Sequence, residues 1–110
     1  MHDSPVDPTV FAELSEAMGE DFARELLDTF LADASTLFAE LQRAVDAADA
    51  AGYRRASHTL KSNALTFGAV ALAEQARDME HAGVPDGAAV AAAQALFDAS
   101  AVALRGACHD

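Results

Sequence analysis

The sequence contains no tryptophan, and it has one tyrosine, three prolines and one cysteine in 110 residues. The single cysteine, Cys108, excludes an intramolecular disulfide and is typical of a chain that folds in a reducing compartment. Residues with β-branched side chains are scarce beside alanine and leucine, which favours helices and leaves little material for strands. We therefore expect one all-α domain over residues 1–110, with a core from about residue 8 to about residue 105 and frayed ends.

Basic residues are also scarce, because seven Lys and Arg stand against eighteen Asp and Glu, for a formal net charge of −11. This balance argues against binding to nucleic acid, which needs a basic stripe, and against binding to anionic membranes. The first residues lack the basic and apolar segments of a signal peptide. No apolar run looks long and clean enough to span a bilayer. We expect a soluble cytoplasmic protein, and the initial Met without linker composition favours a protein that stands alone.

Hydrophobic residues recur with helical periodicity along most of the chain. Asp7 and Pro8 are a typical N-cap and first helical residue, and Gly19 is a typical helix end. The pattern predicts helices over Pro8 to Met18, Glu20 to Ala47 or Ala48, Ala50 to Phe67, Val70 to Ala82, and Ala88 to Arg105. Gly52 weakens the start of the third helix, for which Tyr53 is the alternative start. Four substantial amphipathic helices with short connections predict an antiparallel up-down four-helix bundle, with the short first helix at one end.

The predicted helix that begins near Ala50 has two unlike faces on a helical wheel. Its apolar face carries Tyr53, Ala56, Leu60, Ala64 and Phe67. The opposite face carries Arg54, Arg55, His58, Lys61, Ser62 and Leu65. His58 is therefore expected to face water among cations, in a chain that is otherwise acidic. An imidazole is a nucleophile at neutral pH, and its attack on an acyl phosphate gives a phosphoramidate that can pass the phosphoryl group to another carboxylate.

The neighbours of His58 suit such a site. Lys61, one turn later, places a mobile ammonium on the same face to offset charge on phosphoryl oxygens. Ser62 is small and keeps the approach clear, and Leu65 is apolar on an exposed face, which indicates a docking contact. Arg54 and Arg55 are candidates for pairing with an acidic rim around a partner's active site. Helix solubility is the alternative role for these two arginines.

The motif HTLKSNALTFGA occupies residues 58–69 and is followed by Leu72, Ala76 and then MEHAG at residues 79–83. This combination resembles the pattern of histidine-containing phosphotransfer (HPt) domains, which have His-x-Leu-Lys-Gly, small residues, Gly-Ala and a later Leu-Glu-x-x-Gly block. The resemblance covers the body of the predicted bundle, and its specific part extends from residue 58 to residue 83. The sequence departs from the family at Ser62, where glycine is usual, and the added hydroxymethyl group narrows the approach of a partner.

The resemblance implies a phosphorelay carrier in which His58 accepts a phosphoryl group from a receiver-domain aspartate and passes it to another receiver. It implies that Lys61 neutralises phosphoryl charge. Glu80 lies where the family often has Glu or Gln near the histidine, on the adjacent helix. A docking face around His58 would include the first helix, so Phe11 and Leu14 are candidate partner-binding residues, with burial in the core as the alternative for each.

The expected partners are response-regulator receiver domains and a hybrid sensor histidine kinase, and we expect a monomer. No Gly-rich phosphate loop is present, which favours a phosphoryl carrier over a kinase that binds ATP. The sequence has no Cys/His cluster, so we expect no metal or cofactor here and place Mg²⁺ on the partner receiver. The alternative function is a helical adaptor that binds a receiver or kinase and is never phosphorylated.

Overall fold

The computed structural model describes residues 5–108, and this part of the chain contains five helices and no strand. The helices are α1 (Pro8–Met18), α2 (Glu20–Ala47), α3 (Ala50–Thr66), α4 (Val70–Ala82) and α5 (Gly87–Cys108). The prediction of an all-α chain is confirmed. α3 begins at Ala50 and not at Tyr53, because the side chain of Asp49 caps it by accepting a hydrogen bond from the Gly52 amide at 3.0 Å.

The C-terminal tail differs from expectation. The prediction that the chain frays after Arg105 is wrong for residues 106–108, because they continue α5. His109 and Asp110 lie outside the described residues. Leu104 is fully buried near this end, and its packing holds the last turns of the helix in place.

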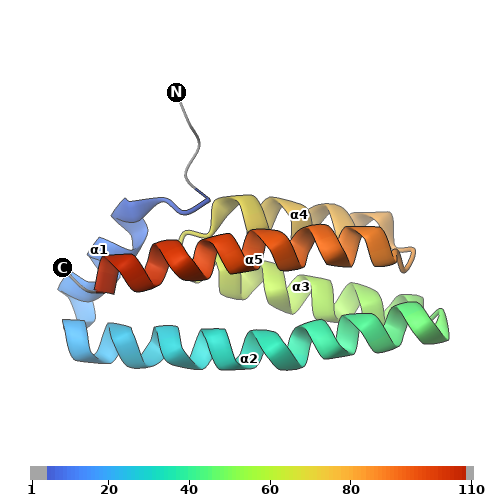
Figure 1. Cartoon of the computed structure of the whole chain (residues 1–110), viewed down its shortest axis with the longest axis horizontal. Helices are drawn as coiled ribbons and strands as arrows, with labels where there is room; N and C mark the ends of the chain where they lie inside the picture. The colour runs from blue at the N-terminus through green and yellow to red at the C-terminus, as the bar shows by residue number, and fades with distance from the viewer. Residues whose placement is uncertain (1–4, 109–110) are drawn as a thin grey trace.

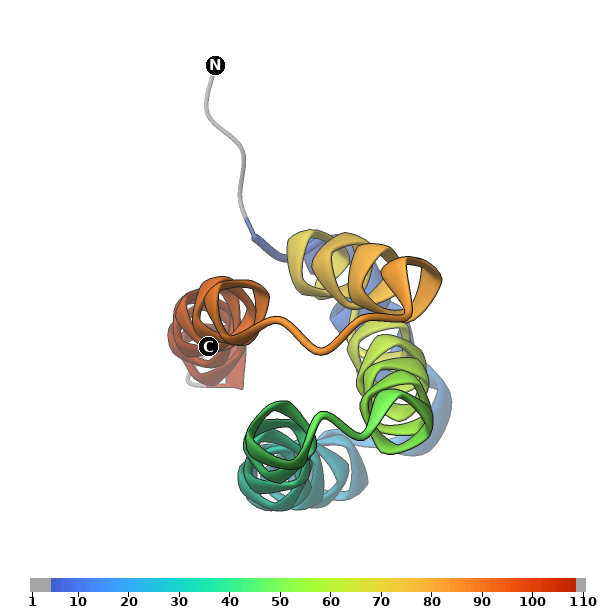
Figure 2. The same ribbon diagram turned by 90° about the vertical axis from the view of Figure 1, so that its right-hand side faces the viewer.

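The four long helices lie side by side around a common core, as the end-on view in Figure 2 shows. In Figure 1 the colour gradient runs in opposite directions along consecutive helices from α2 to α5, and α1 lies at one end of the molecule. α3 packs between α2 and α4, while α5 packs against α2 and α4 on the other side of the core. This arrangement leaves the outer face of α3 free of any other long helix.

An aromatic cluster joins the helices in the core. Phe67, the C-cap of α3, stacks on Phe30 of α2 at a centroid distance of 5.0 Å and contacts Phe11 of α1 at 6.3 Å. Phe30 also meets Phe97 of α5 edge to face at 5.8 Å. Such pairs stabilise a fold by more than their buried area alone. The end of α3 is therefore attached directly to α1 and α2, and through Phe30 to α5.

The turn between α3 and α4 depends on Gly68. Its φ of +71° lies in the left-handed region, and a Cβ built there would lie 2.7 Å from Val10 Cβ and 2.9 Å from the Asp7 carbonyl oxygen. The Gly68 carbonyl accepts a hydrogen bond of 2.8 Å from the Asp7 amide. The turn therefore reverses the chain into α4 and also fixes the start of α1.

α5 corrects one expectation about membranes. The segment Gly87–Gly106 of this helix has a mean hydropathy of 1.5, and by length and composition it could cross a bilayer. The prediction that the chain contains no such segment is therefore wrong. Nine of its twenty residues are alanine, and five are valine, leucine or phenylalanine. A single helix of this kind is weak evidence for a membrane span, because the core helix of a soluble bundle passes the same criterion.

Candidate functional site around His58

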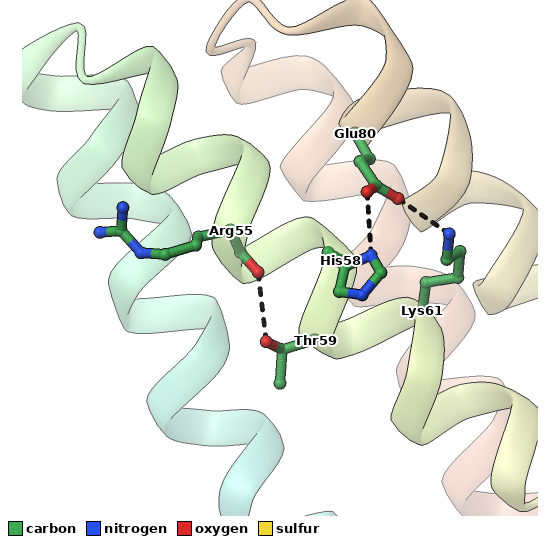
Figure 3. A network of polar contacts seen from close by, with 5 residues as sticks. All are labelled: Arg55, His58, Thr59, Lys61 and Glu80. Atoms are coloured by element: carbon green, nitrogen blue, oxygen red, sulfur yellow. Dashed lines mark hydrogen bonds and ion pairs between the residues drawn. The ribbon is translucent and has the colours of Figure 1, made fainter.

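His58 lies near the middle of α3, on the face opposite the helix's buried residues. Its side chain is 58% exposed, while Ala56 and Leu60 on the other side of the helix are buried. In Figure 3 the ring projects from α3 on the side of Glu80. The helical wheel therefore placed the imidazole correctly, and a reactant can reach it from solvent.

Glu80 of α4 binds both chemical groups of the site. Its Oε2 lies 2.9 Å from Nδ1 of His58, and its Oε1 lies 2.9 Å from Nζ of Lys61 (Figure 3). The hydrogen bond from Lys61 is the main cause that lowers the pKa of the Glu80 carboxyl, and the hydrogen bond with His58 adds to it against partial desolvation. Glu80 is therefore an ionised carboxylate at neutral pH.

The carboxylate defines which nitrogen of the imidazole can react. An ionised carboxylate only accepts hydrogen bonds, so Nδ1 of His58 carries the proton and donates a hydrogen bond to Glu80. In the neutral ring the lone pair then resides on Nε2, which points away from Glu80. The geometry thus presents Nε2 to solvent as the nucleophile, while the hydrogen bond from Nδ1 to Glu80 fixes the orientation of the ring.

Lys61 is placed differently from the simplest expectation. Its side chain is 23% exposed and its ammonium is held by Glu80, on the Nδ1 side of the ring. In this state the ammonium does not extend freely into solvent. A role in neutralising a phosphoryl group on Nε2 would require Lys61 to move from Glu80 or to act across the edge of the ring.

Four of the six residues expected to bind a partner lie at the surface. Arg54, Arg55, Ser62 and Leu65 are all exposed, and the Leu65 residue is 55% exposed. The side chain of Arg55 extends towards α2, away from Glu80, while its carbonyl accepts a hydrogen bond of 3.2 Å from Thr59 (Figure 3).

The assignment of Phe11 to a partner-binding surface is wrong. Phe11 is only 5% exposed because its ring packs on Phe67 in the aromatic cluster. Leu14, one turn further along α1, is partly buried against the same core. The part of α1 that carries Phe11 thus closes the end of the bundle.

The role of Glu80 as the shared acceptor had only a weak signal in the sequence. His58 lies ten residues before Gly68 and Glu80 lies twelve residues after it. In two helices that reverse direction at that glycine, these positions come to a similar level. Spacing thus predicted proximity, but it did not predict that one carboxylate would bind both His58 and Lys61. Among the described residues, no group of three or more His, Cys, Asp or Glu side chains is arranged to hold a metal ion.

Comparisons with known proteins agree with this geometry. A family model described as Hpt domain matches residues 25–109. The crystal structure of histidine-containing phosphotransfer protein B (HptB) from Pseudomonas aeruginosa PAO1 has a TM-score of 0.90 to this chain at 26% sequence identity. The match covers 98% of this chain and 97% of the Pseudomonas chain. No curated protein matches the sequence. The chain belongs to the Hpt domain family and acts in histidine phosphotransfer within a two-component phosphorelay.

Proposed function

We propose that His58 is the phosphoacceptor and that Nε2 is the reacting nitrogen. The observation that carries the proposal is the exposed ring whose Nδ1 is bound to Glu80 at 2.9 Å. The donor is an aspartyl phosphate of a receiver domain, and the acceptor is the aspartate of a second receiver. The protein itself needs only a positioned nucleophile and an open face, since the Mg²⁺ that phosphoryl transfer uses would bind to the receiver.

The transfer step follows from the tautomer. The Nε2 lone pair forms a bond to phosphorus while the bond between phosphorus and the aspartate oxygen breaks, and the electron pair leaves with the aspartate carboxylate. The imidazole becomes positively charged because Nδ1 keeps its proton. The Glu80 carboxylate stabilises that charge through the Nδ1 hydrogen bond, and the positive ring remains a good leaving group for the second transfer.

The remaining features of the proposal concern architecture and cellular setting. The fold would be an antiparallel up-down four-helix bundle of α2 to α5, with α1 as the additional helix at one end. The protein would act in the cytoplasm as a monomer, with receiver domains and a hybrid sensor histidine kinase as partners. Membership of the Hpt family and the free outer face of α3 support this setting.

The rival is an adaptor that binds a receiver without being phosphorylated. To distinguish the two, a receiver domain loaded with radiolabelled acetyl phosphate and Mg²⁺ is mixed with the protein. We expect label on the protein that is lost in acid and stable in base, as a phosphoramidate requires. Binding of the receiver without any transfer of label would instead establish the adaptor.

Replacing Glu80 should slow phosphoryl transfer, because Nδ1 loses its charged acceptor. For Glu80→Ala we expect a rate lower by about 10- to 100-fold, from the loss of a hydrogen bond to a charged group. Glu80→Gln keeps an acceptor oxygen and should lose less. NMR of the His58 ring nitrogens should show the Nδ1-H tautomer in wild type and a mixture in Glu80→Ala. If Glu80→Ala leaves the tautomer of His58 and the transfer rate unchanged, Glu80 has no role in orienting or activating the ring.

Replacing Lys61 should have a smaller effect. A partly exposed ion pair is worth about 1 kcal/mol or less, so Lys61→Ala should change the transfer rate or the phosphohistidine lifetime by about fivefold at most. Lys61→Met keeps much of the aliphatic stem and separates the effect of charge from that of packing. The measurement is the rate of label uptake together with the decay of labelled protein. If neither quantity changes, the ammonium has no part in the chemistry.

A further inference from the structure

A polar pocket opens between the C-terminal half of α2 and the first turns of α3. Its volume is about 430 Å³, and its polar lining includes Glu40, Arg43, Asp49 and Arg55, with Gly52 as part of the wall. The site chemistry described above uses none of these five residues. Arg43 was not singled out from the sequence.

The two guanidinium groups of this pocket make no ion pair within the part of the chain that the structure describes. Neither Arg43 nor Arg55 makes a salt bridge to any described residue, although the chain has eighteen acidic residues. Asp49 is already engaged as the cap of α3, where it accepts the hydrogen bond from Gly52. Glu40 is the other carboxylate in the lining, and it makes no ion pair with either arginine. The pocket therefore holds two guanidinium groups that pair with no described carboxylate, beside the carboxylates of Glu40 and Asp49, on a chain with a net charge of −11.

The pocket adjoins the face of His58. Arg55 precedes His58 by three residues on α3, which is about 4.5 Å along the helix axis, and Gly52 lies about 9 Å away by the same measure. Arg55 leaves α3 on the side of α2, opposite the side of Glu80 (Figure 3). A stable interface buries about 800 Å² on each partner, a footprint roughly 30 Å across. A protein docked over His58 would therefore cover the pocket.

We propose, on the basis of the phosphotransfer function above, that this pocket anchors an acidic segment of the partner receiver. Arginine binds carboxylates through paired hydrogen bonds with a fixed geometry, which suits a specific anchor better than a diffuse attraction. A receiver is acidic around its phosphoryl site, since it carries the reacting aspartate and the oxygen ligands of Mg²⁺. The two arginines attract such a partner to α2 and α3 against the general repulsion by an acidic chain.

Transfer kinetics with matched variants test the proposal. The variants are Arg43→Gln and Arg55→Gln, and the control is Arg105→Gln, which removes the same charge from an exposed position in the last turn of α5. The donor is the receiver that exchanges fastest with wild type, loaded with acetyl phosphate. We expect each pocket variant to lower the second-order rate constant by about three- to tenfold and to weaken its salt dependence. The control should match wild type, and the rate at saturating receiver should be unchanged in all variants.

Direct binding provides the second measurement. An unphosphorylatable Asp→Asn form of the same receiver, added to ¹⁵N-labelled protein, should shift the amide signals of Gly52 and Ala47. Pocket variants that transfer as fast as Arg105→Gln would overturn the proposal, as would shifts from inorganic phosphate alone with none from the receiver. Absence of transfer in wild type itself would instead contradict the phosphotransfer function. Thermal unfolding of each variant shows that the fold is intact.

Discussion

His58→Gln should abolish phosphoryl uptake from a phosphorylated receiver. Glutamine has no basic ring nitrogen, so nothing at position 58 can attack the phosphorus atom. We expect a rate lower by at least about 10³-fold, since removing a nucleophile has effects of this order or more. The measurement is transfer of radiolabel from a receiver loaded with acetyl phosphate. The glutamine amide can still donate a hydrogen bond to Glu80, so the pair of α3 and α4 should stay intact.

His81→Gln is the matched control for this result. His81 is an exposed histidine on α4, directly after Glu80, and the proposed chemistry does not involve it. The control should accept label at the rate of wild type. Retention of acid-labile label in His58→Gln, or its loss in His81→Gln, would show that the phosphoacceptor is another residue. Retained binding of the receiver by His58→Gln would confirm that the substitution removes chemistry rather than docking.

Gly68→Ala should destabilise the fold more than any substitution on the surface of the site. The left-handed φ costs a residue with a Cβ about 1–2 kcal/mol. The added methyl also meets Val10 Cβ at 2.7 Å and the Asp7 carbonyl oxygen at 2.9 Å, and overpacking of this kind costs about 1–3 kcal/mol. We therefore expect the free energy of unfolding to fall by about 2–5 kcal/mol, measured by urea denaturation.

Gly83→Ala separates the two causes. Gly83 ends α4 with a φ of +69°, close to that of Gly68, but the nearest atom to an added Cβ is Arg54 Nη1 at 3.9 Å, an ordinary contact. This control should lose only the backbone contribution of about 1–2 kcal/mol. Equal losses in the two variants would show that the methyl added at residue 68 meets no steric cost from Val10 and Asp7.

The helices were largely predictable because their ends carry local signals. Asp7 and Asp49 cap the starts of α1 and α3 through their own side chains, and Gly83 ends α4 in the left-handed conformation. The exposure of His58 was predictable for a similar reason, since a helical wheel needs only the spacing of apolar residues. Each of these features is determined within a few residues of the sequence.

The features that the sequence left open depend on contacts between helices. Phe11 has the same apolar character whether it faces a partner or the core, and its contact with Phe67 decides the matter. The position of the Lys61 ammonium depends on the rotamer of Glu80, which is 19 residues away in sequence. The pocket of Arg43 and Arg55 forms only when α2 and α3 pack together. Long-range geometry, rather than propensity, determines all three.

The openness of the His58 face limits how long the protein can store what it carries. With 58% of the side chain exposed, bulk water reaches the imidazole whenever no partner is bound. A phosphoryl group on the ring is lost by hydrolysis between encounters with receivers. Transfer succeeds only if the second receiver binds within the lifetime of the phosphohistidine, so the concentration of receivers helps to determine pathway output.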